Sequence, residues 1–323
     1  MIYTITLNPA IDCAIDTGAL ALGKVNRANG QTLRFGGKGI NVSYVLREFG
    51  AKSILTGFAA GFTGDALSSG LAAEGFDCDF IHLANGNTRI NVKLTSSSPE
   101  GDPDTEINAP GPTPSTEDLR LLTDKLSRLT GGDAVVLAGS LPSGVSPAIV
   151  HDVAKSLHDG VSFICDLSGE SLRAALAESP DLIKPNIHEL FELLEIPVTA
   201  ENLSDRELIK GSAARLISMG AKNALITMGN KGAYYILEDG DCGFVLPPIV
   251  PESSNATRSA VGCGDSAVAG WLIGMGYAGK SVRDYAFEAA GVKNAAELAV
   301  AFGSASYYFG FPASPEKVRL LDR

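Results

Sequence analysis

The stretch Ser259-Ala260-Val261-Gly262-Cys263-Gly264-Asp265-Ser266 decides how the rest of this chain is interpreted. Two glycines and an acid stand before a run of small and apolar residues, through Ile273, that predicts a buried helix. A glycine turn that opens a helix points unpaired backbone N–H groups outward, at the positive end of the helix dipole. The stretch therefore predicts an anion-binding site over Gly262–Gly264, with Asp265 beside the bound anion.

Asp265 has two interpretations on this stretch alone. An acid beside an anion is unfavourable unless it has a function, and the usual function is to take a proton from an attacking hydroxyl. The alternative is a carboxylate that only caps the helix, after glycines that only make the turn. The choice between the two depends on what the rest of the chain supplies.

Length and composition are those of an ordinary soluble globular protein. The chain has 323 residues, 45% hydrophobic and 20% charged, enough for one large α/β domain or two smaller ones. Its net charge of -11 argues against nucleic acid or an anionic membrane surface as partners, whereas a small phosphate ligand needs only a local positive pocket. With no secretory signal pattern and no membrane-spanning apolar run, we expect a cytoplasmic protein. Five widely spaced cysteines, without metal-ligand spacing, indicate reduced thiols: Cys13, Cys78, Cys165, Cys242 and Cys263.

Most of the chain alternates strand and helix patterns. Strands are expected at 2–7, 53–58, 133–138, 161–167, 182–184 and 223–228, and helices at 39–49, 65–74, 115–129, 147–157, 170–177, 187–195 and 205–218. Repeated β–α units predict a mostly parallel sheet covered on both faces, with ligands beyond the carboxyl ends of its strands. The segments at those ends are Leu7-Asn8, Gly139-Ser140, Lys184-Pro185-Asn186 and Met228-Gly229.

Two segments, 11–35 and 88–110, carry no helical pattern. Asn85-Gly86-Asn87, between the alternating runs 79–83 and 88–95, predicts a β-hairpin, and the polar residues 96–104 predict a loop tip. We expect the two segments to form one small β-sheet, inserted as a lid into an α/β core of residues 1–10, 36–87 and 111–323. A glycine-rich loop is expected over 57–64.

Several side chains could bind phosphate or sugar. Lys38 stands in a glycine loop at a helix start, which indicates such a site, or an exposed lysine in a turn. Asp12 follows a strand that Pro9 ends, and it could bind a ligand or lie bare on the surface. Arg89 lies in the inserted layer, where its guanidinium could hold a phosphate or stay solvated.

Two further motifs have equally open interpretations. Asn186 and Glu189 lie three apart at a helix start, hence on one face, which suits either oxygen ligation of Mg²⁺ or a helix cap with a surface acid. The stretch 227–232 ends a strand in a glycine turn, which suits either a nucleotide loop or a β-hairpin turn.

Taken together, these motifs resemble the ribokinase-type (PfkB) family of carbohydrate kinases over essentially the full length of the chain. The stretches that carry the resemblance, in order and at the family's spacing, are 6–12, 36–43, 88–93, 105–108, Lys184-Pro185-Asn186 with Glu189, and the opening stretch. The resemblance implies a ribokinase-like α/β fold: a three-layer αβα core with a mostly parallel sheet, plus the small inserted β-sheet lid.

The resemblance also implies a role for each residue. It makes Asp265 the catalytic base and places the moving phosphoryl group in an anion hole formed by Gly262, Cys263 and Gly264. It assigns the sugar phosphate to Asp12, Gly37, Lys38, Asn41, Arg89 and Ser140. It assigns the nucleotide to Lys184, Asn186, Thr227, Gly229 and Gly232, and Mg²⁺, through water, to Glu189.

Within the family, the motifs are most similar to members that use ATP to convert fructose 1-phosphate to fructose 1,6-bisphosphate, with tagatose 6-phosphate as the alternative substrate. The resemblance implies ATP, Mg²⁺ and a monovalent cation as cofactors and a homodimer formed through the lid. Next to the segment where the family binds the monovalent cation, however, this chain has Ser259-Ala260 in place of the more common Asn-Ser or Asp-Thr. A sugar-phosphate sensor would be expected to lose Asp265, which is present. A nicotinamide-binding dehydrogenase needs a glycine fingerprint where Asn8-Pro9-Ala10 stand.

Cys263 is a departure from the family, which has alanine there. A thiol at a helix start feels the positive end of the dipole, which lowers its pKa, while the nearby Asp265 opposes this. The sequence therefore predicts a thiol of moderate reactivity that lines the anion hole, or else a buried thiol that merely fills the alanine position.

Overall fold

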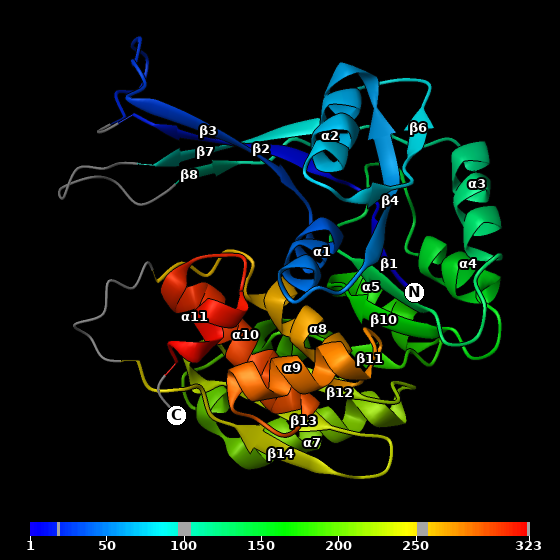
Figure 1. Ribbon diagram of the computed structural model, residues 1–323, viewed down its shortest axis with the longest axis vertical. Coiled ribbons are helices and arrows are strands. Elements are labelled where there is room, and N and C mark those ends of the chain that lie inside the picture. The colour runs from blue at the N-terminus through cyan, green and yellow to red at the C-terminus, as the bar shows by residue number, and fades with distance from the viewer. Residues whose placement is uncertain (18–19, 96–104, 251–257, 322–323) are drawn as a thin grey trace.

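The large sheet is built from short apolar strands that are buried on both faces, as in β9 (Ala134–Ala138), where every residue is buried. The computed structural model describes residues 1–17, 20–95, 105–250 and 258–321 (Figure 1). The other strands of this ten-stranded sheet are β1 (Ile2–Thr6), β4 (Ser53–Ala60), β5 (Asp77–Cys78), β6 (Ile81–Leu83), β10 (Ser162–Asp166), β11 (Leu182–Ile183), β12 (Ala224–Thr227), β13 (Ala233–Ile236) and β14 (Cys242–Val245).

Strand β1 lies inside the sheet, paired in parallel with β4 on one side and β9 on the other. The order across the sheet is β14-β13-β12-β11-β10-β9-β1-β4-β5, with β6 paired to β4. Only the β12–β13 and β13–β14 pairs are antiparallel among the pairings of this sheet that the structure describes. The mostly parallel sheet predicted from the sequence is therefore confirmed.

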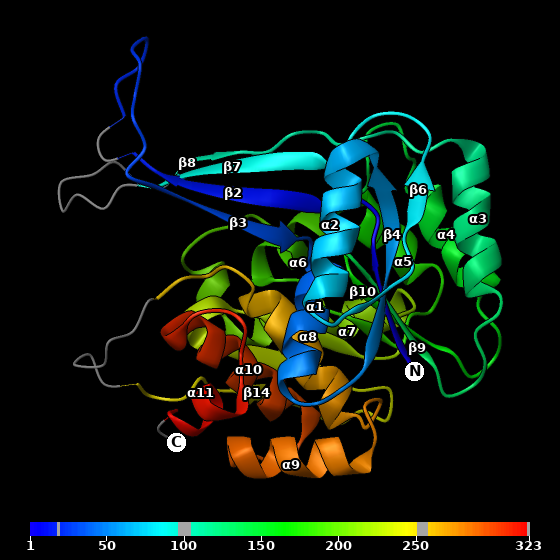
Figure 2. The same cartoon turned by 45° about the horizontal axis from the view of Figure 1, so that its top comes forward.

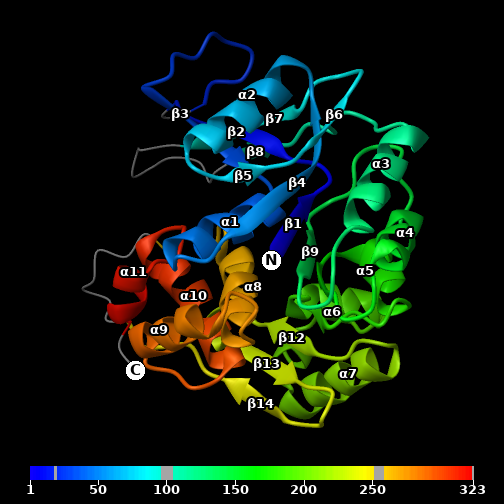
Figure 3. The same cartoon turned by 45° about the vertical axis from the view of Figure 1, so that its right-hand side comes forward.

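Helices cover both faces of the sheet, which completes the predicted three layers (Figure 3). One face is covered by α1 (Lys38–Glu48), α8 (Cys263–Gly274), α9 (Lys280–Ala290), α10 (Ala295–Phe309) and α11 (Pro315–Arg319). The other face is covered by α3 (Thr116–Leu126), α4 (Ala148–Ser156), α5 (Gly169–Leu176), α6 (Ile187–Leu193) and α7 (Arg206–Ser218). In the described parts of the chain, no helix combines the length and the apolarity needed to cross a membrane.

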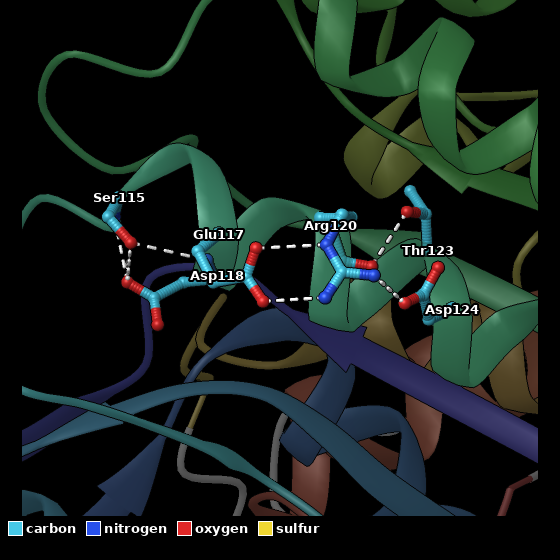
Figure 4. A network of polar contacts seen from close by, with 6 residues as sticks. All are labelled: Ser115, Glu117, Asp118, Arg120, Thr123 and Asp124. Atoms are coloured by element: carbon cyan, nitrogen blue, oxygen red, sulfur yellow. Dashed lines mark hydrogen bonds and ion pairs between the residues drawn. The ribbon is translucent and has the colours of Figure 1, made fainter.

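Helix α3 begins at a capping box formed by Ser115 and Asp118, a serine and an acid three residues apart in the sequence (Figure 4). The Ser115 hydroxyl accepts a hydrogen bond from the Asp118 backbone N–H at 3.2 Å, and the Asp118 carboxylate accepts one from the Ser115 N–H at 2.8 Å. Farther along the same exposed face, Arg120 pairs with both Glu117 and Asp124. The two bonds between Ser115 and Asp118 satisfy backbone N–H groups that the helix start would otherwise leave without partners.

A second, four-stranded sheet projects to one side of the core in the order β3-β2-β7-β8 (Figures 1 and 2). Its strands are β2 (Ala10–Asp16), β3 (Gly30–Gly36), β7 (Arg89–Thr95) and β8 (Thr105–Ile107). The two helix-free segments of the sequence supply nearly all of it. Strand β2 is antiparallel to β3 but parallel to β7, so the two distant segments meet at a parallel pair.

The predicted β-hairpin around residues 85–87 is wrong. Strand β6 pairs with β4 in the large sheet, whereas β7 pairs with β2 in the small one. The cause is Thr88, whose hydroxyl accepts a hydrogen bond from the Ala60 N–H and whose carbonyl accepts one from the Thr63 hydroxyl. These bonds fix the chain at the point where it passes from one sheet to the other. The predicted loop tip over 96–104 lies outside the described residues.

The loop expected over 57–64 is also wrong. Strand β4 runs on to Ala60, and helix α2 (Gly61–Ala73) follows it at once. Phe58, Ala59 and Ala60 are buried and pair with β6. Burial of apolar residues thus outweighs the glycines that indicated a loop.

Gly270→Ala should lower the stability of the fold, because α8 and α10 approach closely there. A Cβ on Gly270 would lie 2.8 Å from the Leu298 carbonyl oxygen, so the helices must shift, at a cost of about 1–3 kcal/mol. Gly211→Ala in α7 is the matched control, since a Cβ there meets no atom within 4 Å and should stabilise by about 0.5–1 kcal/mol. Urea unfolding of both variants checks the prediction; a gain for Gly270→Ala would contradict the close approach.

Candidate active site

The carboxyl ends of β10, β11 and β12 and the start of α8 enclose a cavity of about 780 Å³. Many of the residues that the sequence singled out line it, although they are spread over most of the chain. They are Lys38, Lys184, Asn186, Glu189, Thr227, Gly229, Gly232, Gly262, Cys263, Gly264 and Asp265. The cavity therefore occupies the edge of the sheet at which ligands of parallel sheets bind.

The glycine turn opens α8 as predicted. Gly262 is the N-cap residue, with a left-handed backbone at φ 73°, and a Cβ there would overlap the ring of Phe311. The Ser266 hydroxyl donates to the Gly262 carbonyl at 2.8 Å and shares a 2.7 Å hydrogen bond with the Ser306 hydroxyl on α10. Ser266 and Ser306 thus hold the turn in place through hydrogen bonds, while Gly262–Gly264 line the cavity.

Asp265 does not cap its helix. Its side chain is buried, with 6% exposure, and its carboxylate accepts a 2.7 Å hydrogen bond from Asn41 on α1. The N-cap position of α8 has no side-chain cap bond. Burial, and then the nearby Asp166, raise the pKa of Asp265 to about 6, against the opposing effects of Asn41, Lys38 and Lys184. The carboxylate is ionised at neutral pH, yet it is a stronger base than an ordinary aspartate.

Asp166 is the site residue that the sequence reasoning missed. Its side chain is fully buried at the carboxyl end of β10, and its Oδ1 accepts from Lys38 Nζ at 3.0 Å and lies 3.3 Å from Lys184 Nζ. Burial alone would raise the pKa of Asp166, but the two lysines outweigh it and hold that pKa below its usual range. The signal in the sequence was an acid that ends an otherwise apolar strand at the ligand-binding edge.

Lys38 is an ion-paired lysine and not a free one. Burial would lower its pKa, but the carboxylates of Asp166 and Asp265 outweigh burial and raise it, so the ammonium group stays charged. Lys184 reaches the same carboxylate from the segment after β11. The cavity wall therefore holds two cations beside the amide turn, which suits a polyphosphate.

For Asn186 and Glu189, the helix-cap interpretation is confirmed. The Asn186 side chain accepts from the His188 and Glu189 N–H groups at 2.9 Å, and the Glu189 carboxylate accepts from the Asn186 N–H at 2.7 Å. Both side chains also line the cavity. Within the described residues, no three acidic, histidine or cysteine side chains converge as a metal cage.

The stretch 227–232 is a β-hairpin connection that also faces the cavity. It joins the antiparallel strands β12 and β13 through a short 3₁₀ helix (Gly229–Lys231), and the Met228 N–H donates to the Gly232 carbonyl at 2.8 Å. Thr227, Gly229 and Gly232 lie in the cavity wall. The β-hairpin interpretation of this stretch is therefore confirmed, and its role as a nucleotide loop stays a prediction, as for Asn186.

The remaining predicted residues lie on the small sheet, at the start of α1 and after β9. Asp12 accepts a 2.9 Å hydrogen bond from Asn91 on β7, and burial raises its pKa. Gly37 and Asn41 lie at the start of α1, and Ser140 follows β9. None of these predicted residues belongs to the described cavity wall, although Asn41 touches Asp265.

Arg89 is half-buried and is not a solvated strand residue. Its guanidinium donates to the Asn8 carbonyl at 2.9 Å and to the Ala109 carbonyl at 3.2 Å. Burial lowers its pKa, although the Asp12 carboxylate opposes this. Its buried Nε has no hydrogen-bond partner among the described residues, so a donor remains for a ligand.

The predicted lowering of the Cys263 pKa is wrong. Burial, followed by the Asp265 carboxylate, raises the pKa of this thiol to about 11, and Sγ lies 3.4 Å from the Ser259 carbonyl oxygen, to which it donates. The helix dipole is too weak to offset the loss of solvent. Cys263 lines the cavity as a neutral thiol, and the predicted moderate reactivity loses its basis.

Comparison with known proteins adds to this geometry. The model of the pfkB family of carbohydrate kinases matches residues 5–307. The chain is 38% identical over 272 residues to a 1-phosphofructokinase of Borreliella burgdorferi, covering 84% of each chain. It is 37% identical over 276 residues to that of Bacillus subtilis, covering 85% of this chain and 86% of the relative.

Solved structures of phosphofructokinase-2 from Escherichia coli are similar in fold. The complex with fructose-6-phosphate has a TM-score of 0.82 at 26% identity and covers 99% of this chain and 97% of the other. The complex with potassium has a TM-score of 0.84 at the same identity and coverage. The core and the small sheet together therefore match a known architecture.

Proposed function

The chain belongs to the pfkB family of carbohydrate kinases, and on that premise we propose that it transfers the γ-phosphoryl group of ATP to fructose 1-phosphate, giving fructose 1,6-bisphosphate. It is an ATP-dependent sugar-phosphate kinase. The observation that carries the proposal is the buried Asp265, ionised at neutral pH and placed directly after the amide turn and beside two cations. The relatives named 1-phosphofructokinase support the choice of sugar.

In this reaction the C6 hydroxyl of the sugar forms a bond to the γ-phosphorus while the bond to the ADP oxygen breaks. The N–H groups of Gly262 and Gly264, with that of Cys263, which makes only a long 3.4 Å bond to the Ala260 carbonyl, hold the moving phosphoryl group. Lys38 and Lys184 neutralise charge on the phosphates. Asp265 accepts the hydroxyl proton, which leaves late in a loose transition state. Asn41 orients the carboxylate through its hydrogen bond. Asn186, Thr227, Gly229 and Gly232 form the nucleotide side of the cavity.

The family implies a divalent metal, and we propose Mg²⁺. The residues present fit that ion, because Glu189 lines the cavity and the buried Oδ2 of Asp166 has no hydrogen-bond partner among the described residues. One or two carboxylates, with waters and nucleotide phosphates, suit Mg²⁺ better than a closed cage of protein ligands. When bound, the ion neutralises phosphate charge. The potassium complex of the E. coli neighbour supports a monovalent cation as a further cofactor.

On the sugar side, we propose that the small sheet acts as a lid and that Asp12 binds sugar hydroxyls. Ser140 and Arg89 bind the phosphate already on the substrate, whereas Lys38 and Asn41, with Gly37 next to them in sequence, hold the reacting end of the sugar beside Asp265. Tagatose 6-phosphate is the alternative substrate. A coupled assay of ADP release across fructose 1-phosphate, fructose 6-phosphate and tagatose 6-phosphate tests the choice. The proposal fails if another sugar phosphate has the highest kcat/KM.

We also propose a homodimer formed through the lid. On one face of the small sheet, Leu33, Ile90 and Ile107 are exposed by 59%, 43% and 58%, whereas Asp12 and its neighbours face the other way. Such an apolar sheet face with open edges needs a cover, and a second copy of the chain supplies the same surface. One structure of the E. coli neighbour is a tetramer, which supports self-association in this fold.

If Asp265 is the base, kcat/KM should fall as pH drops below about 6, because protonation removes the acceptor. With both substrates limiting, the profile from about pH 5 to 8 reports the free enzyme. Asp265→Asn should lower kcat by roughly 10²–10⁴-fold while substrate binding changes little. Retention of most turnover, or a flat pH profile, would remove Asp265 from the mechanism.

Arg89→Ala should weaken fructose 1-phosphate binding by about 1.5–3 kcal/mol, as expected for a charge-assisted hydrogen bond to its phosphate. The loss should largely vanish for unphosphorylated fructose. Arg89 also holds the Asn8 and Ala109 carbonyls, so equal losses for both sugars would show that it only supports the lid. Isothermal titration with each sugar separates the two outcomes.

Ile107→Glu should convert the dimer to a monomer, because it places a charge on the apolar lid face, on its edge strand β8. Sedimentation velocity measures the result. Leu320→Glu, an equally exposed apolar position on the core, is the control and should remain dimeric. A monomeric unmodified protein at micromolar concentration would contradict the proposal.

A further inference from the structure

We infer that Arg34 is a positioning residue: stacked on Phe311, it ties the small sheet to the anion-binding turn and so aligns the sugar hydroxyl with the phosphoryl group. The inference rests on the proposed function, and it concerns residues that none of the motifs above includes. It stands on an unbroken set of contacts from strand β3, through one aromatic ring, to Gly262.

Arg34 lies on the site-facing side of the small sheet. Arg34 on β3 pairs with Asp12 on β2, which in turn pairs with Asn91 on β7, so the three side chains lie on the same face of the sheet. Its guanidinium carbon lies 4.1 Å from the centre of the Phe311 ring and 5.3 Å from that of Tyr44, within range of a cation–π interaction. Burial lowers the pKa of Arg34, and Tyr44, Asp12 and Asp265 oppose this, so both carboxylates are near enough to act on its charge. Arg34 therefore stands between the sugar-binding and the proton-accepting carboxylates.

Phe311 is held firmly by the core. Lys317 on α11 donates to the carbonyls on either side of it, Gly310 at 2.6 Å and Pro312 at 2.7 Å. Its ring also meets Tyr44 edge to face, with the ring centres 6.4 Å apart. On its other side the ring presses against Gly262, where a Cβ would overlap it. One fixed ring thus contacts both the cation of the lid strand and the first residue of the anion hole.

This arrangement has a consequence for catalysis. The sugar binds to the lid through Asp12, while the phosphoryl group binds to the turn, and in-line transfer depends on their relative placement. A misplacement of about 1 Å can cost as much as 10²-fold in rate. A partly desolvated cation–π contact corresponds to roughly 2–30-fold in the population of the aligned arrangement. Loss of the contact should therefore lower kcat more than it raises the KM for ATP.

The test compares Arg34→Met, which keeps the bulk of the side chain, with Phe311→Leu, which keeps an apolar side chain. Each should lower kcat by roughly 3–30-fold. The double variant should be no slower than the slower single, because both changes break the same contact. Arg34→Lys should recover part of the loss, since an ammonium group also binds an aromatic face.

Arg47→Met is the matched control. Arg47 lies 4.2 Å from the Phe76 ring centre and 5.2 Å from that of Tyr44, so it makes the same kind of contact on the same shared ring. It belongs to α1, and its side chain donates to the Glu74 carbonyl at 2.8 Å. Its kcat should equal that of the unmodified enzyme, and urea unfolding of every variant confirms that each is folded.

Hydrogen exchange of the backbone amides supplies a readout that needs no substrate. In Arg34→Met and in Phe311→Leu, exchange should rise in both β3 and residues 259–265, whereas in Arg47→Met it should rise in neither. If the effects of the two single changes on kcat multiply in the double variant, Arg34 acts directly on the substrate and the inference is wrong. Unchanged exchange in β3 and residues 259–265 would likewise show that Arg34 does not tie the small sheet to the anion-binding turn. If the unmodified protein does not turn over fructose 1-phosphate, the proposed function fails, yet the exchange result still decides the inference.

Discussion

The buried carboxylate of Asp166 is the constraint on which the rest of the site depends. An ionised carboxylate without solvent costs several kcal/mol unless cations and hydrogen bonds compensate it. Here Lys38 comes from α1 and Lys184 from the segment after β11, and both meet one oxygen at the end of β10. This pairing brings three distant segments together and places two lysines at the cavity wall. After burial, the Asp166 carboxylate is the next cause of the raised pKa of Asp265, and the two lysines oppose it.

Structural and functional roles coincide in this site more often than they compete. Asn186 and Glu189 cap α6 and also line the cavity, and the loop 227–232 is both a hairpin connection and part of the cavity wall. A capped helix start is itself a rigid platform for polar groups, so the two uses reinforce each other. Asp265 is the contrast: it is buried beside Asn41 and contributes no cap, a costly placement that is typical of functional sites.

The site is completed by contacts between the two sheets. Arg89 reaches from β7 to the Asn8 carbonyl of the core, and Arg34 reaches from β3 to Phe311. Thr88 fixes the chain where it crosses from one sheet to the other. Each contact anchors a strand of the small sheet at its core end, which suits a lid whose position relative to the anion-binding turn must be well defined.

The sequence by itself determined what local patterns encode: the alternation of strands and helices, the glycine turn before a buried helix, the capping box of α3, and motifs whose spacing resembles a family of kinases. Only the tertiary structure decided the rest, because it arises where segments distant in sequence meet. The pairing of Asp166 with two lysines, the passage of the chain at Thr88 in place of a hairpin, and the raised pKa of Cys263 all follow from burial and from neighbours many residues away. Local patterns do not say which distant segments meet a given polar side chain, so the sequence indicated many of the residues that line the cavity but not the interactions that hold them.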